Sequence, residues 1–122
     1  MPREVRLVVT GAPVTKKRAR SGNGTHYTPA DTRAYEQTVA WTARSAGRPF
    51  NRQPLHITIA FHVHRRKGDV DNLAKSILDG LEKGGLIPND TWVDHLVVQR
   101  VIDPGEPECA VVTVSEIETV TA

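Results

Sequence analysis

The stretch Leu55–His64, which reads LHITIAFHVH, decides the fold because its apolar side chains alternate. Every second residue from Leu55 to Val63 is large and apolar, and the residues between them are His, Thr or Ala. A period of two is typical of a strand that buries one face of a sheet. The basic sequence RRKG at 65–68 ends the strand. We therefore predict a central strand at 55–64, with Leu55, Ile57, Ile59, Phe61 and Val63 facing the core.

Before this strand, β-branched residues at Val5–Thr10 predict a first strand. The stretch Thr15–His26 holds four basic residues and the sequence SGNG, which predict a mobile basic loop. A helix follows, with Thr28 as its N-cap and Pro29 at its first position. Its apolar face extends to Ala46, where Gly47-Arg48-Pro49 ends it.

After the central strand, an apolar stripe predicts a second helix from about Asp71 to Lys83, ended by Gly84-Gly85. A strand is expected at His95–Ile102. Turn residues at 103–107 then favour a hairpin with a last strand at Cys109–Ile117. The order β-α-β-α-β-β predicts an α+β, two-layer fold in which two helices pack on one face of a mixed four-stranded sheet.

Size and composition fit one domain over residues 1–122, because the chain has 122 residues, of which 39% are hydrophobic. The single cysteine, Cys109, excludes an internal disulfide framework. Apolar runs are strand-sized, and the charged N-terminus is followed by no signal-peptide core. We therefore expect a cytoplasmic protein.

The net charge of +2 conceals an uneven distribution. Residues 1–68 contain 13 Lys and Arg against 3 Asp and Glu, whereas residues 69–122 contain 3 against 11. Such halves suggest that one part binds a polyanion and the other a cation. The alternative is that the fold simply pairs the opposite charges.

Two carboxylates stand two residues apart where the chain leaves the central strand, at Asp69 and Asp71. Neighbouring carboxylates repel, and a hard divalent cation such as Mg²⁺ relieves that repulsion. The alternative is a charged turn in which Asp71 or Asn72 caps the helix. Asp90 follows a turn at Pro88-Asn89, where an Asp is common for backbone reasons, but it would complete an oxygen site if the chain returned to Asp69.

One face of the second helix carries Asp71, Lys75, Asp79 and Lys83 at four-residue spacing. As structure, this spacing predicts a ladder of exposed ion pairs. As chemistry, it places an ammonium one turn beyond a metal-binding carboxylate, where Lys75 would contact a phosphate. The spacing alone favours the ladder.

Taken together, Asp69-Val70-Asp71-Asn72-Leu73-Ala74-Lys75, then Asp79-Gly80-Leu81, then Gly85 and Asp90 resemble the RusA family of Holliday junction resolvases. The resemblance implies a homodimeric, Mg²⁺-dependent endonuclease, with Mn²⁺ as a substitute, that cuts four-way DNA junctions by paired incisions in recombination and repair. It implies that Asp69, Asp71 and Asp90 bind the metal and that Lys75 is catalytic or contacts phosphate. The family often has Asp-Asp at the acidic turn, where this chain has Asn89-Asp90.

The basic residues near this motif are expected to contact the DNA backbone, largely without reading its sequence. They are Lys16, Lys17, Arg18, Arg20, Arg65, Arg66 and Lys67. Two alternatives stay open. One is a non-catalytic module that binds nucleic acid, and the other is a related nuclease that acts on flap or fork DNA.

Overall fold

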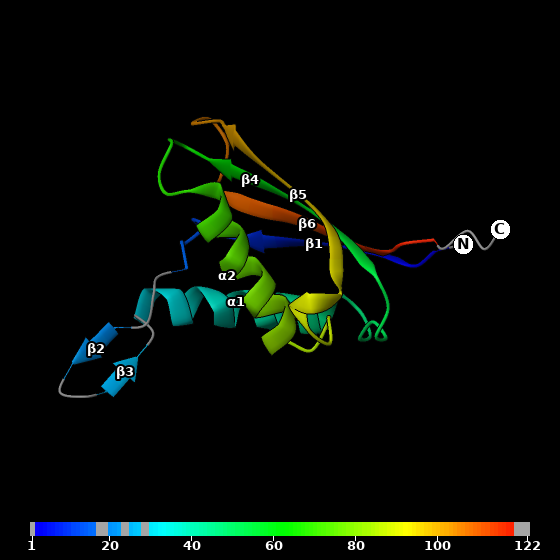
Figure 1. Ribbon diagram of the computed structural model, residues 1–122. Helices are drawn as coiled ribbons and strands as arrows, with labels where there is room; N and C mark the ends of the chain where they lie inside the picture. Colours follow the sequence, from blue (N-terminus) through cyan, green and yellow to red (C-terminus); the bar gives the residue numbers. More distant parts are fainter. Residues whose placement is uncertain (1, 17–19, 23–24, 28–29, 119–122) are drawn as a thin grey trace.

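Strand β4, Leu55–Val63, lies inside a four-stranded sheet in the computed structural model, which describes residues 2–16, 20–22, 25–27 and 30–118 (Figure 1). Its burial alternates strictly, so that each odd-numbered residue is buried and each even-numbered residue is partly exposed. Leu55, Ile57 and Phe61 are completely buried. The predicted alternation of the central strand is therefore confirmed.

The sheet has the strand order β1-β6-β4-β5, with β1 at Glu4–Thr10, β5 at Val93–Ile102 and β6 at Cys109–Glu116. Strand β4 pairs parallel with β5 and antiparallel with β6, so the sheet is mixed. The predicted hairpin between the last two strands is wrong, because β6 lies between β1 and β4. Its alternate residues Ala110, Val112 and Val114 are completely buried, whereas every residue of the edge strand β5 is exposed or partly exposed. The better-buried strand thus takes the central position.

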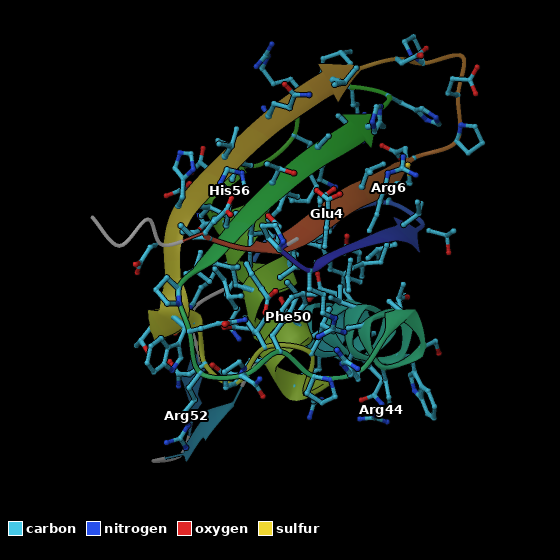
Figure 2. All side chains as sticks on the ribbon, turned by 90° about the vertical axis from the view of Figure 1, so that its right-hand side faces the viewer. Glu4, Arg6, Arg44, Phe50, Arg52 and His56 are labelled. Atoms are coloured by element: carbon cyan, nitrogen blue, oxygen red, sulfur yellow. The ribbon has the colours of Figure 1, made fainter. Side chains whose placement is uncertain are left out.

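Helices α1, Ala30–Ala46, and α2, Val70–Lys83, cover the same face of the sheet (Figure 1). Figure 2 shows the sheet that contains β1, β6, β4 and β5 above the two helices, with α1 nearest β1. The helices approach closely at Gly80, where a β-carbon would overlap the side chain of Val39. The α+β architecture predicted from the element order is confirmed. None of the helices in the described ranges is long and apolar enough to cross a membrane.

The segment predicted as a basic loop, Thr15–His26, overlaps two short antiparallel strands, β2 at Arg20–Gly22 and β3 at Thr25–Tyr27. The sequence between them is Asn23-Gly24, and a two-residue Asn-Gly connection is a strong hairpin signal. The prediction of a basic loop alone therefore missed these two strands. The predicted cap residues of α1, Thr28 and Pro29, lie outside the described residues, and α1 begins at Ala30.

Candidate active site

The turn between β4 and α2 presents Asp69 and Asp71, and contacts from distant residues hold it. Gly68 has a φ of +78°, in the left-handed region that glycine tolerates best. Arg100 on β5 donates from Nη2 to the carbonyl oxygens of Lys67, at 3.4 Å, and Gly68. Arg100 is expected only as a residue of the strand at His95–Ile102, and its position along the chain gives no sign of this contact. The backbone of the turn is thus fixed from the neighbouring strand.

Asp69 is the N-cap residue of α2, so the prediction that Asp71 or Asn72 caps the helix is wrong. The helix begins at Val70, directly after the left-handed Gly68 and the extended Asp69. The Asp69 carboxylate makes no capping hydrogen bond, although its carbonyl oxygen accepts from the Leu73 amide at 3.0 Å. Asp69 at the N-cap and Asp71 in the first turn therefore both lie at the N-terminus of α2, where the helix dipole favours negative charge.

The acidic turn after α2 returns to the helix at Lys75, one turn beyond Asp71. Lys75 Nζ donates to Asp90 Oδ2 at 2.9 Å. The Asp90 amide donates to Glu82 Oε1 at 3.0 Å and begins a 3-10 turn, Asp90–Trp92. The Asn89 side chain accepts from the Thr91 amide at 2.8 Å and caps that turn. Asn89 is thus used for local structure, and Asp90 is the carboxylate that faces α2.

The charged face of α2 forms a network that reaches α1, and only part of the predicted ladder is present. Asp79 accepts from Lys75 at 3.2 Å and from Lys16 at 3.1 Å. Lys16 also donates to Glu36 on α1 at 2.7 Å, and only 7% of Glu36 is exposed. Within the described part of the chain, Asp71 and Lys83 make no ion pair with this face. The Lys75–Asp79 pair therefore follows from helical spacing, whereas the pairs of Lys16 and Asp90 depend on tertiary contacts.

The network keeps both lysines charged. The hydrogen bond to Asp90 is the main cause that raises the pKa of Lys75 above its ordinary value, and Asp79 adds to it. Partial burial alone would lower the pKa of Lys16, but its hydrogen bonds to Glu36 and Asp79 outweigh that effect and raise it. Both side chains therefore carry a positive charge at neutral pH.

Whether Mg²⁺ fits this site depends on its oxygen donors and their placement. Carboxylate oxygens suit Mg²⁺, which binds through one or two of them and keeps waters and substrate phosphates as its other ligands. Asp69 and Asp71 supply that donor set. However, no three His, Cys, Asp or Glu side chains converge on one metal position within residues 2–16, 20–22, 25–27 and 30–118. The donor chemistry therefore fits Mg²⁺, while a cluster of three carboxylates does not form in a single described chain.

The basic residues predicted to contact DNA fall into three groups. Lys17 and Arg18 lie outside the described residues, as does the side chain of Arg20, which begins β2. Lys16 is held by two acidic side chains. The others, Arg65, Arg66 and Lys67, are exposed in the turn after β4 and have no ion-pair partner among the described residues.

Comparison with known proteins identifies the family of this chain. Residues 10–114 match the family described as endodeoxyribonuclease RusA. The chain therefore belongs to the RusA family of endodeoxyribonucleases. It is similar to the crossover junction endodeoxyribonuclease RusA of Aquifex aeolicus (strain VF5), with 27% identity over 110 residues. That alignment covers 84% of this chain and 85% of the relative.

Proposed function

We propose that this chain is a Mg²⁺-dependent endonuclease that resolves four-way DNA junctions by paired, symmetric cuts in recombination and repair. One observation carries the proposal. Lys75 Nζ on α2 donates to Asp90 Oδ2 at 2.9 Å, although the two residues are 15 positions apart. The same helix carries Asp69 at its N-cap and Asp71 in its first turn. These four residues lie inside the matched range 10–114. The name of the similar Aquifex aeolicus protein supports a crossover junction as the substrate.

In this proposal Asp69, Asp71 and Asp90 hold Mg²⁺, for which Mn²⁺ can substitute. Because the three carboxylates do not converge among the described residues, Asp90 would have to move toward Asp69 and Asp71 when the cation and DNA bind. When bound, the cation would stabilise negative charge on the phosphate and make water a better nucleophile. Asp69 suits the role because its carboxylate is not used to cap α2. Asp90 comes from the turn after α2, and its carboxylate binds the ammonium of Lys75, which also contacts Asp79.

Lys75 acts as a fixed positive charge rather than as a base, because its raised pKa keeps it protonated. An ammonium has three donors, and Asp79 and Asp90 take two of them. The third is available for a phosphate oxygen, and 47% of the side chain is exposed to receive it. Donors held in place before the reaction stabilise developing charge at no cost of reorganisation.

We further propose that the protein works as a homodimer. A four-way junction is nearly two-fold symmetric, and paired cuts need two active sites related by the same symmetry. Arg65, Arg66 and Lys67 are suited to contact the backbone of the DNA arms, because they are exposed and carry no ion pair among the described residues.

The decisive experiment is Asp71→Asn assayed on a synthetic four-way junction with and without Mg²⁺. We expect cleavage to be abolished and junction binding in EDTA to stay within about twofold. Asp94→Asn is the matched control, because Asp94 is an exposed carboxylate on β5. Cleavage by Asp71→Asn at the wild-type rate would refute the site assignment.

The same assay separates the alternatives. A non-catalytic module would give no product with any divalent cation, and Mg²⁺ would not raise its melting temperature. A flap or fork nuclease would cut those substrates faster than the junction. Each result would replace the proposed substrate or activity by a defined one.

A further inference from the structure

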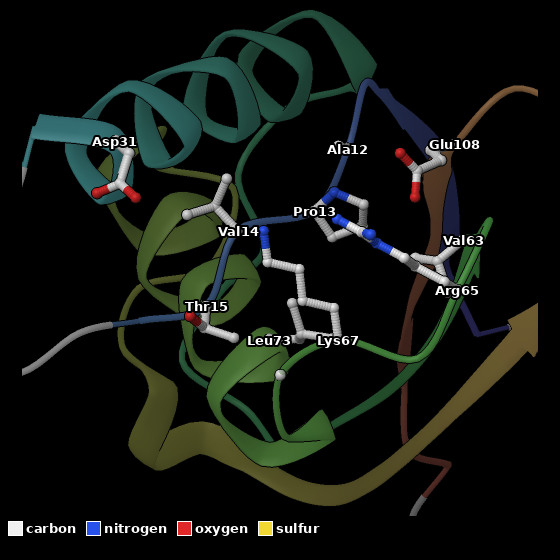
Figure 3. A pocket seen from close by; sticks show the side chains of 11 residues that line it. Ala12, Pro13, Val14, Thr15, Asp31, Val63, Arg65, Lys67, Leu73 and Glu108 are labelled. Atoms are coloured by element: carbon white, nitrogen blue, oxygen red, sulfur yellow. The ribbon is translucent and has the colours of Figure 1, made fainter.

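A cavity of about 480 Å³ opens beside the turn that leads into Asp69 (Figure 3). Its walls come from the segment after β1, the start of α1, the end of β4, the turn at 65–68, the first part of α2 and the residue before β6. The volume lies in the range of cavities that hold small organic ligands. This cavity is therefore large enough for more than a lone phosphate, and it adjoins the proposed site.

One side of the cavity is apolar. Val63 is 7% exposed and Leu73 is 2% exposed, and both belong to the hydrophobic core. Pro13 and Val14 face them from the segment after β1, as Figure 3 shows. A phosphate gains nothing from such walls, whereas the flat face of a nucleobase is apolar and would be removed from water there.

The lining also carries charged side chains, namely the cations Arg65 and Lys67 and the carboxylate of Asp31 at the start of α1. Figure 3 shows the side chains of Arg65 and Lys67 extending into the cavity. Neither has an ion-pair partner among the described residues, in contrast to Lys16 and Lys75. Two free cations against an apolar wall match a group that is anionic at one end and apolar at the other.

A carboxylate at the rim adds a polar contact for such a group. Glu108 lines the cavity, and its Oε2 accepts from the backbone amide of His64 at 3.0 Å. Its orientation is thus fixed by the end of β4. A carboxylate accepts hydrogen bonds from the exocyclic amino groups of bases.

We propose that this cavity receives one unstacked nucleotide of the DNA substrate, with its phosphate on Arg65 and Lys67 and its base against Val14, Val63 and Leu73. The proposal rests on the proposed function, because it takes the substrate to be branched DNA. Moving a base out of a duplex is costly, and the cost is least where stacking is already interrupted. A pocket for one unstacked nucleotide would therefore favour a branch point over a continuous duplex. Since Gly68 and Asp69 follow Lys67 directly, it would also place the next phosphate beside the carboxylates.

The test uses a four-way junction with 2-aminopurine at the branch point, bound in EDTA so that no cleavage occurs. The fluorescence of 2-aminopurine rises when the base leaves the stack. We expect wild-type protein to raise the signal severalfold, and a junction that is abasic at that position to bind about five- to tenfold more weakly. Equal affinity for the intact and abasic junctions would overturn the proposal, because the cavity would then hold a phosphate only.

Variants locate the effect. Arg65→Gln and Lys67→Gln should each weaken junction binding about tenfold, and duplex binding much less. Arg66→Gln is the matched control, because Arg66 stands between them with the same charge and does not line the cavity. Equal losses on junction and duplex in all three variants would mean general backbone contact and would overturn the proposal.

A third variant tests the cavity itself without removing a charge. Ala12 is exposed at the rim, so Ala12→Trp should fill the cavity, abolish the 2-aminopurine signal and leave duplex binding unchanged. A full signal from this variant would contradict the proposal. All these measurements are made without a divalent cation. Failure of wild-type protein to cleave with Mg²⁺ would therefore refute the proposed function and leave the nucleotide pocket standing.

Discussion

Two pairs of basic side chains flank the first turn of α2, and their surroundings are opposite. Lys16 and Lys75 are enclosed by carboxylates, with Lys16 between Glu36 and Asp79 and Lys75 between Asp79 and Asp90. Arg65 and Lys67 face a cavity and have no acidic partner among the described residues.

The two pairs have the same formal charge, but their surroundings suit them to different roles. A lysine held by carboxylates is positioned before substrate arrives, so it can stabilise structure or a transition state. A cation without an acidic partner can bind a DNA phosphate without breaking an ion pair in the protein, and it displaces only water. The basic half of the sequence is therefore not one DNA-binding surface, and the following predictions test the division.

The largest effect is expected from Lys75→Met. Junction cleavage should fall about 10²–10³-fold, the range found when one preorganised charge at a reacting group is removed. Junction binding in EDTA should change less than about threefold, because this lysine offers a single free donor. Lys83→Met is the control, since Lys83 is exposed on the same helix. A weakening of binding as large as the loss of cleavage would place Lys75 among the DNA-binding cations instead.

Lys16→Met should act on stability rather than on DNA binding. It leaves Glu36, which is 7% exposed, without its cation. Leaving a buried polar group without a partner costs about 1–3 kcal/mol. Urea unfolding should show a loss of this size, which Glu36→Gln in the same chain should largely restore.

Lys67→Met supplies the contrast for that experiment. An exposed side chain without partners should change the free energy of unfolding by less than about 0.5 kcal/mol. It should instead reduce the salt dependence of DNA binding by about one phosphate contact. If Lys16→Met and Lys67→Met had equal effects on stability, the two pairs of cations would not differ as described.

Gly68→Ala tests the turn that connects the cavity lined by Arg65 and Lys67 with the carboxylates that begin at Asp69. The φ of Gly68 is +78°, and a β-carbon there would lie 2.5 Å from Thr15 Cγ2. Backbone strain alone should cost about 1–2 kcal/mol in urea unfolding. Since the turn carries Lys67 on one side and Asp69 on the other, cleavage and 2-aminopurine fluorescence should both decrease.

Gly105→Ala is the control for Gly68→Ala. A β-carbon at Gly105 would meet only Asp103 Oδ1, at an ordinary distance of 3.5 Å. We expect no loss of cleavage from this change. A harmless Gly68→Ala would show that the turn tolerates movement and that its geometry does not link the two regions.

The periodicity of apolar residues predicted the individual strands and helices, because these depend on interactions between residues close in the sequence. The alternation of Leu55–His64 located β4, and the apolar stripe located α2 with Gly84 as its C-cap. Turn residues at 103–107 predicted a reversal, but they carry no information about which strand lies next to which. The insertion of β6 between β1 and β4 follows from burial of Ala110, Val112 and Val114, which needs the whole sheet.

The same limit applies to the site. Four-residue spacing placed Lys75 and Asp79 on one face of α2, and they do form an ion pair. The contacts of Lys16 and Arg100 join segments far apart in the sequence, so spacing could not reveal them. Glu36 did carry a signal: it lies three and seven residues before Val39 and Ala43, on the buried face of α1. A carboxylate at such a position needs a cation, and Lys16 supplies it.

The smallest effect concerns pH. The hydrogen bond to Asp90 chiefly raises the pKa of Lys75 above its ordinary 10.5, so the ammonium form stabilises the fold. A raised pKa in the folded state makes this stabilisation complete below pH 10.5 and removes it as the pH rises through the folded value. The difference in unfolding free energy between wild type and Lys75→Met should therefore be constant from about pH 8 to 10 and shrink above that. A difference that already falls near pH 8 would mean that Lys75 loses its proton early, and it would then be available as a base rather than as a fixed charge.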